Sequence, residues 1–197
     1  MYLIFKLCNR TDNSYLPYLD GENVSRYQLS WNGEYIKYGD NLAAMREAKL
    51  FKNPRILVRQ IPSKSEYAIE AVYTNDQFIN DRNSMIITNI NVNAYYLLGI
   101  INSRLISLWF LMRYDKFQRR LFPQFKVNEL GHFPIPSTSI ENQEKIGRLV
   151  KELMSETNKD IASAFEIENL NRSIDECVMD LYKLSEGEKQ IVREFEI

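Results

Sequence analysis

The longest apolar stretch of the chain, from Asn93 to Tyr114, most narrowly limits what the chain can fold into. Its large apolar side chains recur at helical spacing, at Leu97, Leu98, Ile101, Leu105, Leu108 and Met112. A bilayer-spanning helix needs about 20 mostly apolar residues, but an arginine at mid-membrane, here Arg104, costs roughly 2.5–3.5 kcal/mol or more. Ser103 and Ser107, four residues apart, add a polar stripe. The stretch therefore predicts one long helix in the core of a folded domain and no membrane span.

Chain length and cysteine usage limit the class of protein. The 197 residues, of which 45% are hydrophobic, suit one domain of ordinary size or one domain with an appendage. Cys8 and Cys177 are far apart in the sequence and form neither a CxxC pair nor a disulfide framework. Residues 1–8 are too short an apolar segment for a signal peptide and lack a basic leader. We therefore expect a protein of the reducing cytoplasm.

Local patterns predict a β-rich portion before the long helix. Short apolar or aromatic runs between turn signals predict strands at residues 1–7, 27–29, 35–38, 55–61, 67–74 and 84–90. Asn32-Gly33 is a strong hairpin signal between the second and third of these runs. A turn is expected at residues 16–21, and a helix is expected at residues 41–51, ended by Pro54.

Helical periodicity returns after residues 127–136, which two prolines keep irregular. Further helices are predicted at residues 140–156, 166–183 and 189–195, with Ser185 as the cap before the last of them. The predicted fold class is α+β. A mixed or antiparallel β domain with one long core helix is expected over residues 1–136, and a helical C-terminal region over residues 137–197.

Charge is distributed unevenly between these two regions. Residues 1–136 hold 17 Lys and Arg against 12 Asp and Glu, whereas residues 137–197 hold 8 against 14. The balance is +5 for the first region and −6 for the second, in agreement with the net charge of −1. Ordinary drift in composition can produce such an asymmetry, and so can nucleic-acid contact by the basic region.

Residue patterns typical of catalysis are scarce. The single histidine, His132, is interpreted as a loop histidine beside a proline turn. The seven glycines stand singly, so the sequence has no glycine-rich phosphate loop. Asp40 with Glu47 and Lys49 has the spacing of a carboxylate nuclease that binds Mg²⁺. Because Glu47 and Lys49 fall in a helical pattern, we interpret them as a solvated helix face.

Basic and aromatic side chains alternate in two segments and favour nucleic-acid binding. The first segment contains Arg26, Tyr27, Lys37, Tyr38, Arg46, Lys49, Lys52, Arg55 and Arg59. The second contains Arg113, Tyr114, Lys116, Phe117, Arg119, Arg120, Phe122, Phe125 and Lys126. Arginine and lysine neutralise phosphates, and amide side chains such as Gln60 read adenine edges. A solvated surface gives a similar pattern, so this signal alone has low specificity.

Several stretches, in this order, resemble the TaqI-like C-terminal specificity domain. That domain is the target recognition domain of adenine-specific DNA methyltransferases and of fused type IIG restriction-modification enzymes. The stretches are LPYLDGENVSRY (16–27), YIKYG (35–39), FKNPRILVRQI (51–61), YYLLGIINSRLISLWF (95–110) and FPQFKVNELGHFPIP (122–136). The tail IDECVMDLYKLSEGEKQIV (174–192) resembles the C-terminal helices of the same enzymes. Together they cover most of the chain.

The resemblance implies sequence-specific recognition of double-stranded DNA. In such enzymes a separate domain binds S-adenosylmethionine and methylates a flipped adenine with an Asn-Pro-Pro-Tyr type motif. Here the only Asn-Pro pair, Asn53-Pro54, is followed by Arg55. We therefore expect no catalytic residue, metal or cofactor in this chain. S-adenosylmethionine and Mg²⁺ are expected only in a partner methyltransferase domain or subunit, with or without an endonuclease. The resemblance leaves open whether the chain is a fragment, a truncated product or a free-standing subunit.

On this reading, the predicted DNA contacts are Arg26, Tyr27, Lys37, Tyr38, Arg59, Gln60, Arg113, Lys116, Arg119, Arg120 and Lys126. Arg59 and Gln60 are the preferred base or phosphate contacts, and Arg119, Arg120 and Lys126 are the preferred phosphate contacts. Two alternatives stay open at this point. One is a helical protein-interaction module without a DNA role, and the other is a small Mg²⁺-dependent nuclease.

Overall fold

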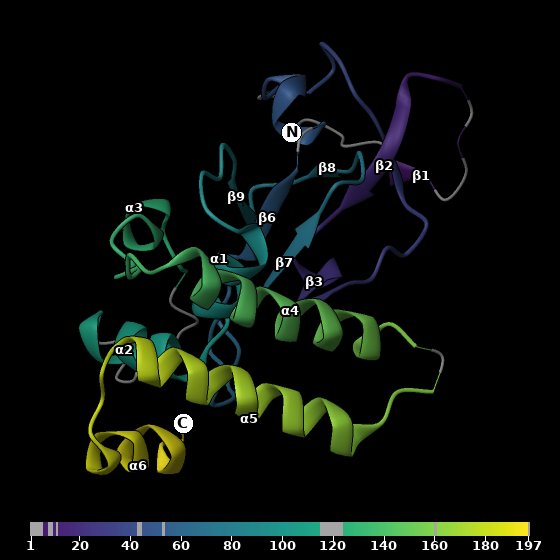
Figure 1. The fold of residues 1–197 in the computed structure, drawn as a ribbon. Helices are drawn as coiled ribbons and strands as arrows, with labels where there is room; N and C mark the ends of the chain where they lie inside the picture. Colours follow the sequence, from purple (N-terminus) through teal and green to yellow (C-terminus); the bar gives the residue numbers. More distant parts are fainter. Residues whose placement is uncertain are drawn as a thin grey trace.

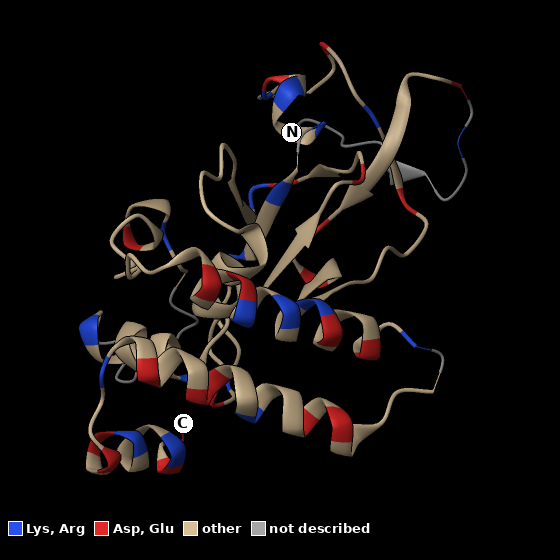
Figure 2. Cartoon of the chain, in the orientation of Figure 1, with Lys and Arg blue, Asp and Glu red and all other residues tan. Residues whose placement is uncertain are grey.

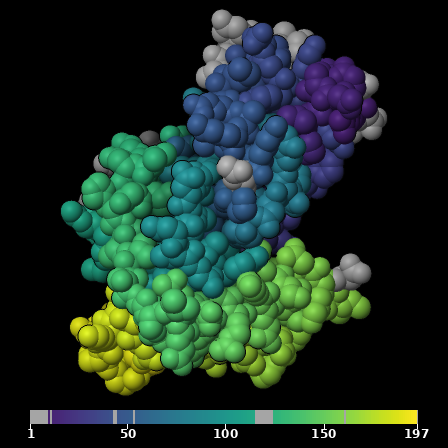
Figure 3. Space-filling model, turned by 45° about the horizontal axis from the view of Figure 1, so that its top comes forward, coloured from purple at the N-terminus to yellow at the C-terminus, as the bar shows by residue number. Residues whose placement is uncertain are grey.

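The computed structural model describes residues 6–7, 10, 12–42, 45–52, 54–114, 124–159 and 161–196. Most of the strands lie at one end of the molecule, and the helices α4, α5 and α6 lie at the other (Figure 1). The space-filling view shows the same division between N-terminal and C-terminal residues (Figure 3). The mixture of sheets and helices confirms the predicted α+β class.

Within the described ranges, the strands form three sheets. The first has the order β1-β5-β2-β8 and consists of Lys6–Leu7, Tyr35–Lys37, Tyr15–Leu19 and Ile79–Asn80. Its pairs are antiparallel except for β2 and β8, which run parallel. The second pairs β3 and β4, Val24–Ser25 and Gln28–Leu29. The third is antiparallel, with the order β7-β6-β9, and consists of Ala71–Thr74, Arg55–Arg59 and Ser84–Ile87.

Strand β6 lies at the centre of the third sheet and is covered on both faces. Ile56 and Val58 point into the main core. This is the large cluster of buried apolar side chains, to which α1, α2, α4 and α5 also contribute residues. Leu57 points the other way and packs with Val72 in a smaller cluster. A strand buried on both faces needs apolar residues at successive positions, which accounts for the run Ile56-Leu57-Val58.

Polar caps begin the five longer helices. These are α1 (Ala94–Ile101), α2 (Arg104–Arg113), α4 (Ile140–Thr157), α5 (Ala164–Leu181) and α6 (Glu186–Glu194). Their caps are Asn93, Ser103, Ser139, Ser163 and Ser185, whose side chains accept hydrogen bonds from backbone N–H groups in the first turn. A single turn, α3 (Val127–Leu130), lies in the segment predicted to be irregular.

The long helix predicted from Asn93 to Tyr114 is in fact two helices, α1 and α2, bent by 55° at a short break. Ser103 caps α2, because its hydroxyl accepts a hydrogen bond from Ile106 N at 3.2 Å. Asn102 turns its amide toward β7, accepting from Ala71 N and donating to Ala71 O, both at 2.9 Å. Among the described residues, no single helix is long and apolar enough to cross a bilayer, although the bent pair meets both criteria together. Many apolar side chains of the pair lie in the main core.

Helix α4 packs closely on α1 at a glycine. A Cβ atom at Gly99 would lie 2.9 Å from the Cγ2 atoms of Ile146 and Val150. The main core contains residues from both sides of the predicted domain boundary, with Ile146 and Val150 from α4 and Ile174 from α5. The boundary between residues 136 and 137 stays a prediction.

Three local predictions are wrong. Residues 16–21 do not begin with a turn, because strand β2 continues through Pro17 to Leu19 before the 3-10 helix η1 (Gly21–Asn23). The Asn32-Gly33 turn does not join a hairpin, because β4 pairs with β3 while β5 pairs with β1 and β2. Among the described residues of the helix predicted at 41–51, residues 45–47 are not helical, and Ala48–Phe51 form the 3-10 helix η2. Residues 1–5 of the first predicted strand lie outside the described residues.

Candidate nucleic-acid interface

The predicted contacts Arg26 and Tyr27 have intramolecular roles in this structure. Arg26 Nε donates to the Asn102 carbonyl at 3.0 Å, and a terminal nitrogen donates to Asn171 Oδ1 at 2.6 Å. Its guanidinium carbon lies 3.7 Å from the centre of the Tyr67 ring. The Tyr27 side chain is 1% exposed, and burial raises its pKa to about 12. The prediction that Tyr27 contacts DNA is wrong for the folded chain, because its ring is enclosed in the main core.

Arg55, a member of the first basic segment, is also structural. Its side chain is fully buried and donates to the Asp76 and Phe78 carbonyl oxygens at 3.0 and 3.1 Å. Burial lowers the pKa of this guanidinium. Arg55 therefore holds the loop before β8 against β6, away from any external anion.

Lys37 and Tyr38 lie at the far end of the β portion, beside η2. Lys37 is exposed on β5, whereas the Tyr38 ring packs edge-on against Phe51 with 6.0 Å between ring centres. The Tyr38 hydroxyl donates to the Arg46 carbonyl. The exposed cations Lys49 and Lys52 extend this surface, which lies at the top of Figure 2.

The residues of the alternative nuclease site lie in the same region. Lys49 Nζ forms an ion pair with the Glu47 carboxylate at 2.5 Å, and both side chains are exposed. Among the described residues, no group of three His, Cys, Asp or Glu side chains is arranged to hold a metal ion. Glu47 and Lys49 are thus a local ion pair on the surface.

Arg59 and Gln60 lie at the end of β6, where three segments meet. Arg59 forms an ion pair with Glu70 Oε2 at 2.6 Å, with both side chains largely covered. The backbone of Gln60 is bonded to two other segments, since its N–H donates to Asn83 O and its carbonyl accepts from Phe125 N, each at 2.7 Å. These bonds bring the backbones of the three segments together. We call the residues at and beside them that are not fully buried the junction surface: Gln60, Ile61, Arg82, Gln124 and Lys126.

The junction surface combines cations with amide groups. Arg82, Gln124 and Lys126 are exposed, and Gln60 is half-buried. Lys126 precedes α3, where its backbone N–H donates to Glu129 Oε2 at 2.9 Å, so its side chain projects from a fixed backbone position. Phosphate-binding and base-reading side chains are of these types. The structure thus brings the predicted contacts Arg59, Gln60 and Lys126 into one area.

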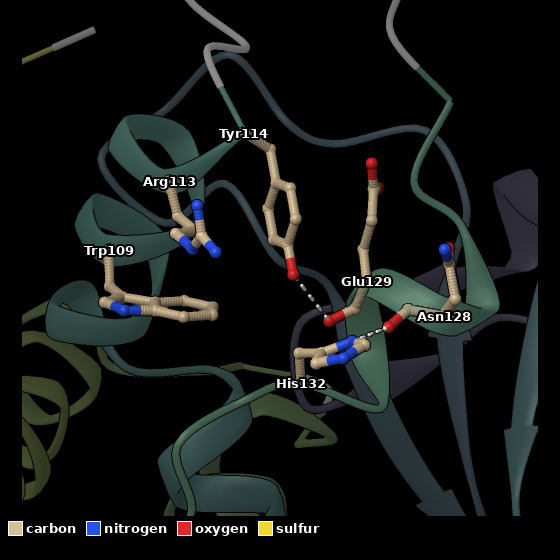
Figure 4. A pocket seen from close by; sticks show the side chains of 6 residues that line it. All are labelled: Trp109, Arg113, Tyr114, Asn128, Glu129 and His132. Carbon is tan, nitrogen blue, oxygen red and sulfur yellow. Dashed lines mark hydrogen bonds between the residues drawn. The ribbon is translucent and has the colours of Figure 1, made fainter.

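A pocket of about 280 Å³ lies beside this surface, between the end of α2 and the α3 turn. We call it the α2–α3 pocket, and its lining residues are Trp109, Arg113, Tyr114, Asn128, Glu129 and His132 (Figure 4). Arg113 and His132 are exposed. The Tyr114 hydroxyl donates to the Glu129 carbonyl at 3.4 Å, and His132 Nδ1 lies 2.5 Å from the Asn128 carbonyl oxygen.

Aromatic packing fixes the floor of the α2–α3 pocket. The Trp109 ring meets the Phe133 ring edge-on at 5.6 Å, and Phe133 stacks on Phe125 at 5.4 Å. Sequence reasoning assigned His132 to a loop and gave it no part in the site. The available signal in the sequence was that His132 follows the end of the second basic segment, Lys126, by six residues. The predicted contacts Lys116, Arg119 and Arg120 lie outside the described residues.

A buried carboxylate fastens the helical layer, which we define as α4, α5 and α6, to the rest of the chain. Asp175 on α5 accepts hydrogen bonds from the Tyr67 hydroxyl at 2.8 Å and from Arg104 N at 2.9 Å. The Arg104 side chain donates to the Val192 and Phe195 carbonyl oxygens at 2.8 and 2.6 Å. Burial raises the pKa of Asp175, against the opposing effect of nearby Arg26. The contact joins α2, α5 and the end of α6.

Comparison with known proteins defines the family. The TaqI-like C-terminal specificity domain matches residues 16–135, which is more than half of the chain. The chain therefore belongs to the TaqI-like C-terminal specificity domain family. The matched residues run from β2 to just beyond α3, and they include the junction surface and the α2–α3 pocket.

Two similar proteins are much longer than this chain. A protein of Methanocaldococcus jannaschii, named "Putative type II restriction enzyme and methyltransferase RM.MjaORFECS2P", is 29% identical over 137 residues. The match spans 66% of this chain and 11% of that protein. The type IIL restriction-modification enzyme MmeI, solved in complex with DNA, has a similar fold with a TM-score of 0.62 at 10% identity. That likeness covers 94% of this chain and 32% of the MmeI chain.

Proposed function

We propose that this chain recognises a specific sequence in double-stranded DNA as the specificity part of a restriction-modification methyltransferase. The family match over residues 16–135 carries this proposal. The M. jannaschii relative, named for both restriction and methylation, supports it. The expected enzyme class is adenine-specific and of the fused type IIG kind, and it acts in the cytoplasm.

The junction surface and the α2–α3 pocket are the proposed DNA-facing side. In the described part of the chain, the side chains of Arg82, Arg113 and Lys126 make no ion pair, so these cations are available to neutralise phosphates. Gln60 and Gln124 supply amide groups that suit base edges. Arg59 contributes less positive charge to this surface than the sequence predicts, because the Glu70 carboxylate pairs with its guanidinium.

The helical layer is proposed to face away from DNA. Residues 137–197 carry an excess of acidic side chains, 14 against 8 basic ones, and an anionic surface repels phosphate. Several of its cations are already paired, for example Arg193 with Glu176 and Glu186. Methyl transfer itself is assigned to a partner methyltransferase part, which would hold S-adenosylmethionine and Mg²⁺. The matched segment of this chain spans 11% of the M. jannaschii protein, so most of that protein lies outside the match.

A binding experiment with matched lysine variants tests the proposal. Fluorescence anisotropy with a random duplex pool at low salt should show binding, and sequencing of the bound DNA should return one shared motif. Lys126→Ala should weaken binding to all sequences and lower the salt slope by about one. Lys145→Ala removes the same charge from an exposed position on α4 and should leave affinity unchanged. No binding above background, or equal losses in both variants, would contradict the proposal.

A further inference from the structure

The α2–α3 pocket presents two nitrogen-bearing side chains from different elements to one space. Arg113 comes from the last turn of α2, and His132 follows α3. Within the described ranges, the Arg113 guanidinium makes no hydrogen bond or ion pair, and its carbon atom lies 5.9 Å from the centre of the Tyr114 ring. An exposed guanidinium without an intramolecular acceptor is suited to bind an external anion.

The hydrogen bond of His132 determines which ring nitrogen faces a ligand. The Asn128 carbonyl oxygen can only accept, so Nδ1 must carry the hydrogen that is donated to it at 2.5 Å. In the neutral ring Nε2 is then an acceptor and cannot donate to an anion. After the ring takes up a proton, Nε2 becomes a charged donor. Anion binding by His132 Nε2 therefore requires protonation.

Two of the other polar groups lining the pocket, the Glu129 carboxylate and the Tyr114 hydroxyl, are engaged in hydrogen bonds within the chain. Glu129, the one acidic residue among the lining residues, accepts from Lys126 N through Oε2, and its carboxylate points away from His132 in Figure 4. The Tyr114 hydroxyl donates to the Glu129 carbonyl. Because α2 ends at Arg113, its terminal carbonyls cannot donate to an anion. Among the lining side chains, Arg113 and the protonated ring of His132 are therefore the two that can carry a positive charge to an anion.

We propose that the α2–α3 pocket binds a backbone phosphate of nucleic acid between Arg113 and His132, and that this contact takes up one proton from solvent. The inference rests on the proposed DNA-recognition function and adds a specific residue and a pH dependence to it. Inorganic phosphate offers the same chemistry, so the experiment must separate it from a phosphate within DNA.

Because the chain has a single histidine, NMR reports on this site without assignment ambiguity. The imidazole resonances of the full chain are titrated between pH 5.5 and 8.5 with chloride, inorganic phosphate or duplex DNA. Duplex DNA should move the titration midpoint upward by about one pH unit, equivalent to about tenfold in affinity. Arg113→Gln should reduce this movement, whereas Arg148→Gln, which removes an exposed cation of α4, should preserve it.

Duplex affinity over the same pH range separates failure of this inference from failure of the proposed function. The wild-type chain should bind about tenfold more tightly at pH 5.5 than at pH 8.5, after subtraction of the dependence shown by His132→Gln. Binding that persists with no movement of the histidine resonance, and with equal pH dependence in His132→Gln, overturns the phosphate site alone. A response to inorganic phosphate but not to duplex overturns the assignment to nucleic acid. Absence of duplex binding at every pH overturns the proposed function as well.

Discussion

Basic side chains of α5 and α6 and those of the DNA-facing side are used differently. On α5 and α6, Arg193 bonds Glu176 and Glu186, and Lys189 bonds Asp180. Near the junction surface and the α2–α3 pocket, Arg113 and Lys126 make no such pairs in the described part of the chain. Figure 2 shows blue and red residues side by side along the helical layer.

The difference shows why counts of basic residues are a poor guide to a binding surface. A cation that already has an intramolecular acceptor must lose it before it can bind phosphate, whereas an unpaired exposed cation exchanges only water and counterions. Arg26, Arg55 and Arg59 belong to the first basic segment of the sequence, but all three have intramolecular partners. Availability for DNA is therefore decided by tertiary contacts.

The largest expected effect is the loss of the buried carboxylate that joins the two regions. Asp175→Ala should lower the free energy of unfolding by about 3 kcal/mol, because it leaves Arg104 N and the Tyr67 hydroxyl without their acceptor. Asp175→Asn retains an acceptor oxygen and should cost about 1 kcal/mol or less. Urea unfolding measures both. If DNA affinity of the folded variants fell in parallel with stability, the division between the two regions would be wrong.

The pH dependence of the same variants provides a further check. Burial raises the folded-state pKa of Asp175 above its unfolded value, so the folded state binds this proton more readily. The stabilisation is present at low pH and is lost as pH rises above the unfolded value of about 3.9. Relative to Asp175→Asn, the wild-type chain should lose stability as pH rises from 4 toward neutrality. The opposite slope would mean that Arg26 and Arg104 outweigh the cost of burial.

A smaller effect is expected where the helical layer packs on α1. Gly99→Ala should lower the free energy of unfolding by about 2 kcal/mol, because the new methyl group overlaps Ile146 and Val150. Gly187→Ala provides the matched control, since a Cβ atom there meets nothing within 4 Å and alanine favours helices. Thermal unfolding of both variants measures the difference. Equal shifts in melting temperature would show that α1 and α4 are not in tight contact.

The smallest expected effect is a change in DNA affinity when a paired cation, Arg59, loses its acidic partner. Glu70→Gln should free Arg59, raise DNA affinity about twofold to threefold and steepen the salt dependence by about one. Glu168→Gln makes the same charge change at the Arg172 pair of α5 and should leave DNA binding unchanged. Anisotropy titrations at two salt concentrations distinguish the two. A gain in both variants would mean that net charge, and not local pairing, controls affinity.

Periodic segments were the most predictable part of the fold. Helices α4, α5 and α6 begin at or near Ser139, Ser163 and Ser185, because a serine cap followed by a regular apolar stripe is a local signal. Strands β6 and β9 were predictable because each is a short apolar run between turn signals. The break between α1 and α2 was missed, although Ser103 is a good cap, because the apolar periodicity continues across it.

The candidate site was less predictable because its members are joined by long-range contacts. Nothing near Gln60 in the sequence indicates that its carbonyl bonds Phe125 N, and nothing near Arg26 indicates a partner on α5. Tyr27 and Lys37 both lie in matched segments, but one is enclosed in the core and the other is exposed. His132 gained a place in the site only through the fold of α3 against α2.

Asn102 covers part of one margin of the third sheet. Its amide bonds both the N–H and the carbonyl of Ala71 on β7, which lies at one margin of the third sheet. An open strand margin is a template on which a strand of another molecule can add. Asn102 and the Tyr27 N–H, which also donates to the Ala71 carbonyl at 2.9 Å, satisfy both backbone groups at this buried position. One amide side chain thus takes the part of a neighbouring strand within the core.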